Sequence, residues 1–205
     1  MADISAQAVK ELRERTGAGF MDCKRALEET GGDVDKAVAL LKERGAASAE
    51  KKAGREAKDG LVASYIHTGG RIGVLIAVNA ETDFVARNEQ FQTLVRNLAM
   101  QVAGLKPTYV SVESIPADVL DAKRTEILED PVTQSRPENV RDKIVDGQLR
   151  KWYEQVVLLE QPYRDTDINV KQLITDAIAT IGENIVVRRF TRYELGESLD
   201  AGADA

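Results

Sequence analysis

The residues best suited to chemistry in this sequence are an acid–aromatic pair, Asp83-Phe84, within segment 81–88, whose sequence is ETDFVARN. A carboxylate beside a large ring can guide insertion of the ring into another molecule, which is binding rather than covalent chemistry. The local pattern by itself favours a plainer interpretation. In that interpretation Phe84 packs in the core and Asp83 caps the following helix.

Covalent catalysis has few candidate residues. The sequence holds one cysteine, Cys23, and one histidine, His67. Cys23 falls on the apolar side of a helical pattern and His67 ends a strand beside a turn, so we expect neither to act as nucleophile or base. A single cysteine and a single histidine are too few to form a His/Cys cluster that binds zinc. Gly17-Ala18-Gly19 resembles the start of a dinucleotide fingerprint, but Asp22 occupies the third glycine position. We therefore expect no enzyme, catalytic residue, metal site or cofactor.

The composition sets the class of protein. The chain has 205 residues, of which 43% are hydrophobic and 30% charged, with a net charge of −6. This length and composition predict a globular chain with room for one medium domain and a small module. The negative charge does not favour nucleic acid or anionic lipid, and no apolar run approaches the roughly 20 residues of a membrane span. With no signal-peptide pattern at the N-terminus, we expect a cytoplasmic protein that binds neither nucleic acid nor membrane.

The first 60 residues predict a helical module and a connection. Residues 1–45 read as three short helices, with Ser5 capping the first, Asp33 capping the third and Gly45 ending it. Residues 46–60 are charged and rich in alanine without a clear apolar stripe, which indicates a solvated helical linker.

Residues 61–195 predict one α+β domain, a core of antiparallel strands packed with helices. Strands 61–67 and 71–78 flank a short Thr-Gly-Gly connection. Helices follow in the segments after residue 90, after Pro116 and after Pro137, with a looser stretch at 131–137. The final helix has an unbroken apolar stripe and precedes a strand at 185–195. The acidic tail, 196–205, is expected to be disordered.

Two motifs together indicate a family. A helix, a glycine-rich loop displaying Phe20-Met21 and a second helix resemble the docking surface of ubiquitin-associated domains, although inward packing of the two side chains is the plainer alternative. Combined with TDFVARN at 82–88, this arrangement resembles the elongation factor Ts family. RIGVL at 71–75, QPY at 161–163 and IGENI at 181–185 follow the same resemblance, which extends from about residue 3 to residue 196.

The resemblance implies a function and a set of partner-binding residues. Members of this family act as guanine nucleotide exchange factors for elongation factor Tu in translation elongation. The N-terminal module would dock on the partner's GTPase domain, and Asp83-Phe84 would insert near its magnesium and phosphate region. Residues at the end of the last helix and just after it would support contacts beside the phosphate loop. Phe20 stands where the family commonly has methionine, an apolar change compatible with docking. The implied binding residues are Arg13, Met21, Lys24, Thr82, Asp83, Phe84, Val85, Ile181, Gly182 and Asn184.

The resemblance also implies an oligomeric state. Longer members of the family have two core subdomains and a protruding coiled coil, whereas this chain has room for a single core and is similar to the short, homodimeric form. The side of the final strand carrying Ile185, Val187, Tyr193 and Leu195 is the candidate seam, unless it is buried within one core. The alternative function is that of a ubiquitin-associated-like interaction protein or chaperone without exchange activity. A hydrolase is disfavoured because no nucleophile–base pair is present.

Overall fold

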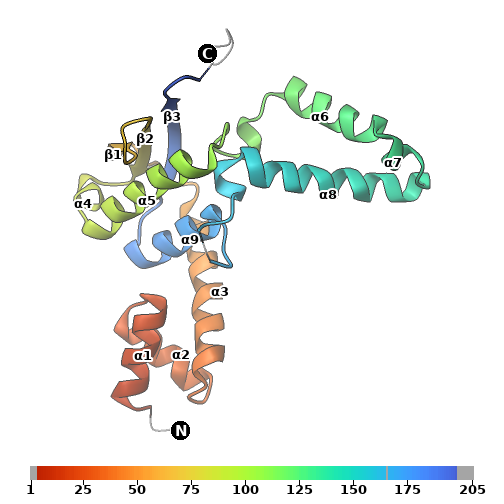
Figure 1. Ribbon diagram of the computed structural model, residues 1–205. Helices are drawn as coiled ribbons and strands as arrows, with labels where there is room; N and C mark the ends of the chain where they lie inside the picture. The colour runs from red at the N-terminus through yellow and green to blue at the C-terminus, as the bar shows by residue number, and fades with distance from the viewer. Residues whose placement is uncertain (1–3, 165, 198–205) are drawn as a thin grey trace. The chain divides into compact units, whose positions relative to one another are not determined.

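The computed structural model describes residues 4–164 and 166–197, which form an α+β fold, and the predicted fold class is confirmed. The predicted disordered tail falls mostly on residues 198–205, which lie outside the described residues. The elements follow one another along the chain as labelled in Figure 1: α1 (Ala6–Thr16), α2 (Phe20–Glu29), α3 (Val34–Lys52), β1 (Asp59–Ile66), β2 (Ile72–Ala80), α4 (Asp83–Ala86), α5 (Glu89–Leu105), a 3₁₀ turn η1 (Val112–Ser114), α6 (Ala117–Glu129), α7 (Pro131–Gln134), α8 (Glu138–Val156), a second 3₁₀ turn η2 (Leu158–Glu160), α9 (Val170–Ile181) and β3 (Val186–Glu194).

The chain divides into two compact units. The first holds the described residues up to Leu61 together with Val78–Leu94 and Gln172–Val186, and the second holds Val62–Ala77, Val95–Lys171 and the described residues from Val187 onward. All ten binding residues implied by the sequence fall in the first unit. The domain boundaries drawn from the sequence stay a prediction. No helix in the described part of the chain is long and apolar enough to cross a membrane.

Helices α1 and α3 begin where their capping residues predict. The Ser5 hydroxyl accepts a hydrogen bond from the Ala8 amide at 3.2 Å, and the Asp33 carboxylate accepts one from the Lys36 amide at 3.0 Å. The latter bond favours the charged form and lowers the pKa of Asp33 below its ordinary value. Cys23 is fully buried, so its predicted packing role is confirmed. The module has a small core of its own, made of Val9, Leu12, Cys23, Ala26, Leu27 and Ala37.

Gly45 does not end the third helix, as the sequence pattern led us to expect. Helix α3 runs through it without interruption to Lys52. A Cβ atom at position 45 would lie only 3.0 Å from the Cβ of Ala179 in α9. The glycine therefore serves a close approach of two helices rather than a helix end, and a single residue type does not distinguish the two uses.

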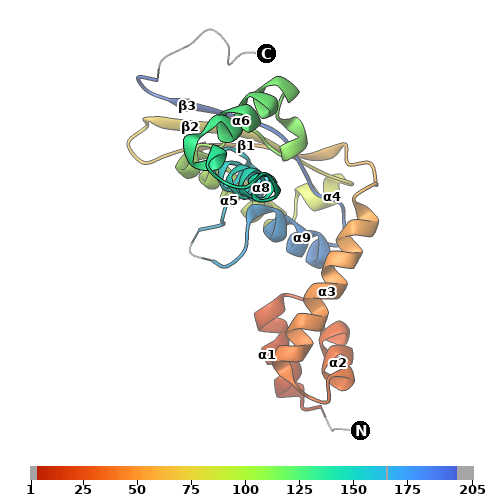
Figure 2. The ribbon, with the colours of Figure 1, turned by 90° about the vertical axis from the view of Figure 1, so that its right-hand side faces the viewer.

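The three strands form one sheet in the order β1-β2-β3, seen side by side in Figure 2. The predicted hairpin joins β1 to β2, with the His67 amide donating to the Ile72 carbonyl at 2.9 Å. Residues of β2 alternate as expected for a half-buried strand, because Val74, Ile76 and Val78 are buried while Leu75 is 52% exposed. The apolar stripe predicted on α5 is confirmed as buried at Phe91, Leu94, Val95, Leu98 and Val102.

The final strand does not present one apolar side. Ile185 and Val187 are buried at 3% and 7% exposure, whereas Tyr193 and Leu195 are each 65% exposed. The reason is a break in the alternation, because the consecutive residues Arg188 and Arg189 are both exposed. The predicted seam is therefore half core and half surface.

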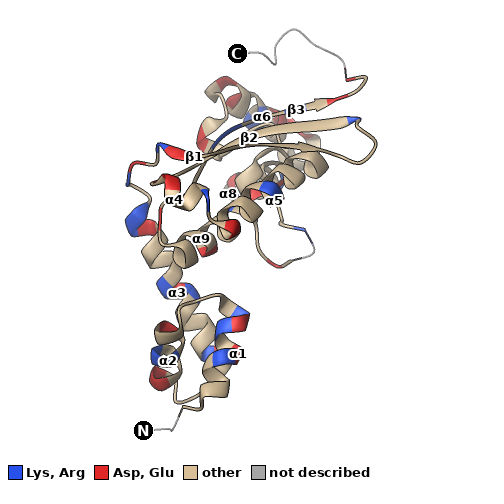
Figure 3. Ribbon diagram, turned by 90° about the vertical axis from the view of Figure 1, so that its left-hand side faces the viewer, with Lys and Arg blue, Asp and Glu red and all other residues tan. Residues whose placement is uncertain are grey.

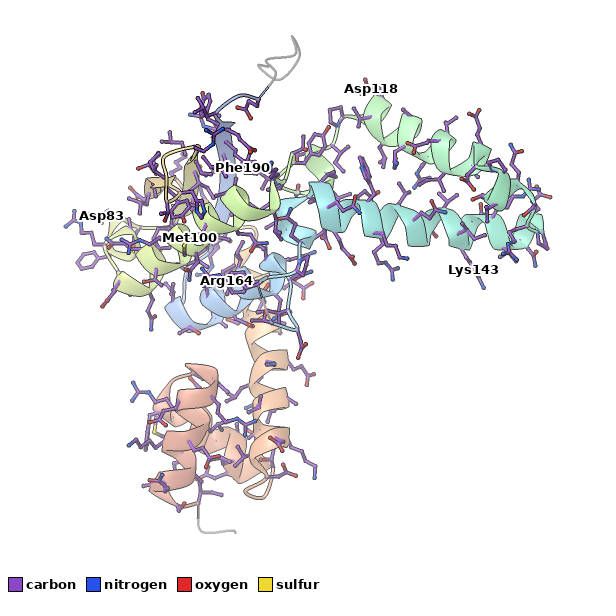
Figure 4. The ribbon with its side chains drawn as sticks, in the orientation of Figure 1. Asp83, Met100, Asp118, Lys143, Arg164 and Phe190 are labelled. Atoms are coloured by element: carbon purple, nitrogen blue, oxygen red, sulfur yellow. The ribbon has the colours of Figure 1, made fainter. Side chains whose placement is uncertain are left out.

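Helices α6 and α8 lie side by side as a hairpin (Figure 1), with a core of Ile127, Val145 and Leu149 that Leu120, Trp152 and Tyr153 cover. The sequence predicted both helices but not their pairing. The stretch at 131–137 is more ordered than expected, because Asp130 accepts hydrogen bonds from the amides of Val132 and Thr133 and starts α7. Asp118 and Lys143, labelled in Figure 4, are exposed on the two helices.

Candidate partner-binding site

Phe84 is the most exposed large apolar side chain in the described part of the chain, at 84%. Its neighbour Val85 is only 8% exposed, so the one-turn helix α4 uses Val85 to reach the core. Successive residues of a helix point about 100° apart, and a single turn lying on the protein surface buries one side only. The local prediction that Phe84 is a core residue is therefore wrong.

Asp83 does not cap α4 either. Thr82 holds the N-cap position, and Asp83 is the first helical residue, where its charge complements the helix N-terminus. Its carboxylate accepts a hydrogen bond from the Arg87 guanidinium at 2.7 Å, and the two side chains are 57% and 79% exposed. Figure 4 shows Asp83 pointing away from the ribbon. Exposed pairs of this kind contribute little to stability, so an incoming partner can replace Arg87 at low cost.

The turn that carries Phe84 is held from a distant part of the chain. Glu183, between α9 and β3, accepts hydrogen bonds from the backbone amides of Glu81 and Thr82 at 3.1 and 3.0 Å and from the Thr82 hydroxyl at 2.7 Å. A carboxylate that receives three such donors makes charge-assisted bonds, which are stronger than neutral ones. Thr82 consequently gives its hydroxyl to Glu183 rather than to its own helix.

The connection is reciprocal. The Glu81 carboxylate accepts a hydrogen bond from the Asn184 amide at 2.7 Å and lies 3.6 Å from the Arg55 guanidinium. We call the residues Glu81, Thr82, Glu183 and Asn184 the clasp. Asn184 is 3% exposed, and its side-chain amide donates to the Arg55 carbonyl at 2.8 Å. The clasp thus joins segments 81–82 and 183–184, and the Asn184 side chain connects them to Arg55.

Glu183 is the functional candidate that sequence reasoning missed. The backbone amides that donate to it lie 102 and 101 positions earlier in the sequence, and no local pattern indicates such a pairing. Of the residues implied around it, Gly182 is exposed, Ile181 is partly buried and Asn184 is buried. The structure thus brings Thr82 into contact with Glu183, and Asn184 into contact with Glu81.

The docking residues implied on the N-terminal module are on the surface. Phe20 and Met21 are 49% and 60% exposed, so the alternative of inward packing is wrong, and they open α2 rather than lying in the loop before it. Arg13 on α1 and Lys24 on α2 are also exposed, and Lys24 lies 3.8 Å from Glu28. Figure 3 shows acidic and basic residues intermixed on both helices. The surface is therefore apolar at one end of α2 with charges of both signs around it.

Comparison with known proteins agrees with this arrangement. A family model described as Elongation factor TS matches residues 34–197. An elongation factor Ts from Desulforamulus reducens is 52% identical over 205 residues, covering 100% of this chain and 94% of the relative. Elongation factor Ts proteins from Carboxydothermus hydrogenoformans and Synechococcus elongatus are 53% and 54% identical, covering 96% and 98% of this chain and 91% of each relative. The chain therefore belongs to the elongation factor Ts family.

Proposed function

We propose that this chain is a guanine nucleotide exchange factor, which promotes release of GDP from elongation factor Tu during translation elongation in the cytoplasm. Phe84 enters the partner near its magnesium and phosphate region, and Asp83 accompanies the ring. The chain carries out no covalent step and uses no metal or cofactor of its own. The observation that carries the proposal is an 84% exposed phenylalanine on a turn held by three hydrogen bonds to one carboxylate.

The energetics of exchange follow from linkage. A factor that binds nucleotide-free partner more tightly than GDP-bound partner must weaken GDP by the same ratio. Each 1.4 kcal/mol or so of differential binding changes GDP affinity about tenfold. Displacement of the groups that organise Mg²⁺ removes the cation that neutralises the phosphates. A side chain that only added affinity to both states equally would not accelerate release.

Some of the remaining implied residues are exposed and would contact the partner, whereas others are buried and would support the contact surface. Arg13, Met21 and Lys24 are exposed and would dock the module on the GTPase domain. Val85 and Asn184 are buried, which supports a role beneath the contact surface rather than in it. Docking by a separate module raises the local concentration of Phe84 at its target, so the wedge itself does not have to supply the whole affinity.

We also propose that the chain is a homodimer, formed through the exposed side of the sheet. Support comes from large apolar side chains that all three strands expose, since isolated monomers rarely leave so many in one area. They are Val62 at 64%, Ile66 at 65%, Leu75 at 52%, Tyr193 at 65% and, directly after β3, Leu195 at 65% exposure. Sedimentation equilibrium of the wild type and of Leu75→Arg tests this, with a dimer expected for the first and a monomer for the second. A monomeric wild type at micromolar concentration would end the dimer proposal.

The exchange proposal is tested by release of fluorescent GDP from purified elongation factor Tu in excess unlabelled GDP. Wild-type chain should accelerate release in proportion to its concentration until it saturates. Phe84→Ala should lose most of that acceleration, and Val132→Ala, an exposed apolar residue of α7 at 64%, should lose none. A chain that binds elongation factor Tu without changing the GDP release rate is an interaction protein, not an exchange factor. An active Phe84→Ala would end only the wedge role.

A further inference from the structure

The turn that displays Phe84 has little intrinsic stability. Helix α4 has four residues, Asp83–Ala86, and a single turn does not persist in water without outside support. Its own anchor in the core is Val85, at 8% exposure. A wedge on a mobile turn would lose binding free energy to the ordering of its backbone on contact. Whatever holds the turn before contact therefore determines how effective the ring is.

The clasp supplies that support from outside α4. One oxygen of Glu183 receives the amides of Glu81 and Thr82, at 3.1 and 3.0 Å, and the other receives the Thr82 hydroxyl at 2.7 Å. Thr82 is thereby held in an extended conformation, with φ −132° and ψ 157°, immediately before Asp83. The direction in which the chain enters α4 decides which of its side chains face outward. With Thr82 held in this way, Val85 turns inward and Phe84 outward.

The Glu183 side of the clasp is itself anchored. Glu81 holds the Asn184 amide at 2.7 Å, and the Asn184 side chain donates to the carbonyls of Arg55 and Ala53 at 2.8 and 3.4 Å. Neither carboxylate can therefore leave without freeing backbone amides on the opposite segment. A partly buried network in which each member satisfies another is more rigid than its separate bonds imply.

We propose that Glu183 is a positioning residue for Phe84, which holds the wedge in the orientation that the exchange step requires. The inference rests on the proposed exchange function. It adds a residue that, in the proposed mechanism, contacts neither the partner nor the nucleotide. Loss of Glu183 should leave docking through the N-terminal module intact. It should lower the maximal GDP release rate at saturation and leave the half-saturating concentration nearly unchanged.

The test compares Glu183→Ala with Glu183→Gln in the GDP release assay. The glutamine oxygen can accept from both backbone amides while its NH₂ donates to the Thr82 hydroxyl, so the glutamine variant should retain most of the rate. The alanine variant should lose about 10- to 100-fold in maximal rate, the scale of loss that follows from misplacing a working group by about 1 Å. Glu126→Ala is the matched control, because this exposed glutamate pairs with Lys123 on the same helix, α6.

A double-mutant cycle separates positioning from general destabilisation. If Glu183 acts through Phe84, the variant Glu183→Ala/Phe84→Ala should be no slower than Phe84→Ala alone. Effects that multiply, or a Glu183→Ala rate equal to the wild type, would overturn the inference while leaving the exchange function in place. If Glu183→Ala does not fold, Thr82→Val removes the 2.7 Å hydroxyl bond alone and should give a smaller loss that also disappears without Phe84.

A second readout does not depend on exchange activity. Hydrogen exchange of the free protein should show slow Glu81 and Thr82 amides in the wild type and in Glu183→Gln, and fast ones in Glu183→Ala. Fast exchange of both amides in the wild type would refute the clasp itself. Failure of the exchange proposal would instead appear as a wild-type chain that leaves GDP release unchanged, with these amides still protected.

Discussion

Replacing Phe84 by alanine should separate binding from folding, because the ring lies almost entirely outside the protein that carries it. The residue is 84% exposed. An aromatic side chain buries about 150–250 Å² when fully covered. Folding therefore covers only about 30 Å² of it, which contributes less than about 1 kcal/mol at 25 cal/mol per Å². We expect the free energy of unfolding of Phe84→Ala to lie within about 1 kcal/mol of the wild type.

The same ring should contribute much more to the free energy of binding the partner than to the free energy of folding. Covering the remaining area of about 170 Å² would contribute at most about 4 kcal/mol, and buried aromatic hot spots cost about 2 kcal/mol or more when truncated. A loss of 2–4 kcal/mol corresponds to a decrease of roughly 30- to 700-fold in the exchange rate per unit concentration of factor. Stopped-flow release of fluorescent GDP measures this decrease directly.

Val85→Ala is the matched comparison, one position along the same turn. Val85 is 8% exposed, and removing two buried methyl groups should cost about 2 kcal/mol of stability. Urea unfolding followed by far-UV circular dichroism is the appropriate measurement. Tryptophan fluorescence would report the α6–α8 hairpin, where the single Trp152 packs.

Equal destabilisation by the two variants would refute the reasoning, since it would mean that Phe84 is packed inside the protein. Retention of full exchange activity by a folded Phe84→Ala would refute the wedge. The expected stabilities differ for the two neighbours: Phe84→Ala folds normally and loses most of its exchange activity, whereas Val85→Ala is less stable.

Three further predictions concern stability. Leu27→Ala should cost about 2–5 kcal/mol and melt the N-terminal module, because Leu27 is fully buried in its small core; hydrogen exchange of α1 to α3 measures the loss. Gly60→Ala should cost on the order of 2–4 kcal/mol in urea unfolding, because φ is +134° there and a Cβ would overlap the Val78 carbonyl oxygen; an unaffected midpoint would contradict this backbone conformation. The pKa of Glu194 is lowered from its ordinary value of 4.5, first by its hydrogen bond with Lys106, so its stabilisation is present above that value and disappears as the pH falls through the lowered pKa. The free energy of unfolding of Glu194→Gln should therefore differ from that of the wild type above pH 4.5, and the two should converge in stronger acid. A difference in this free energy that stays constant with pH would contradict this cause.

Which features of the fold and the site could be predicted from the sequence depends on how far apart the interacting residues are in the chain. The three N-terminal helices, the β1–β2 hairpin, the buried stripe of α5 and the packing of Cys23 all follow from capping residues and from periods within one element. Each of these features depends on neighbours a few positions away. The exposed Phe20-Met21 pair could not be separated from inward packing by the same means, because both alternatives have the same local pattern.

Two of the wrong predictions have identifiable physical reasons. Gly45 looks like a helix end, yet it lets Ala179 approach. The sequence of the final strand alternates in a way that predicts one apolar side, but the consecutive residues Arg188 and Arg189 are both exposed and break the alternation. Val187 therefore faces the core and Tyr193 faces the solvent. The role of Gly45 was thus decided by a residue of another helix, and the two sides of the final strand by a break in its own alternation.

By itself, the sequence determined the family, the α+β class and the pair Asp83-Phe84 as the residues to examine. It did not determine which way that pair faces, and its local pattern favoured the core. Only the tertiary structure decided this, because Val85 occupies the inward position and Glu183 holds Thr82 across about a hundred residues. A four-residue helix has too little intrinsic stability to orient itself, so its orientation comes from contacts that no local pattern records.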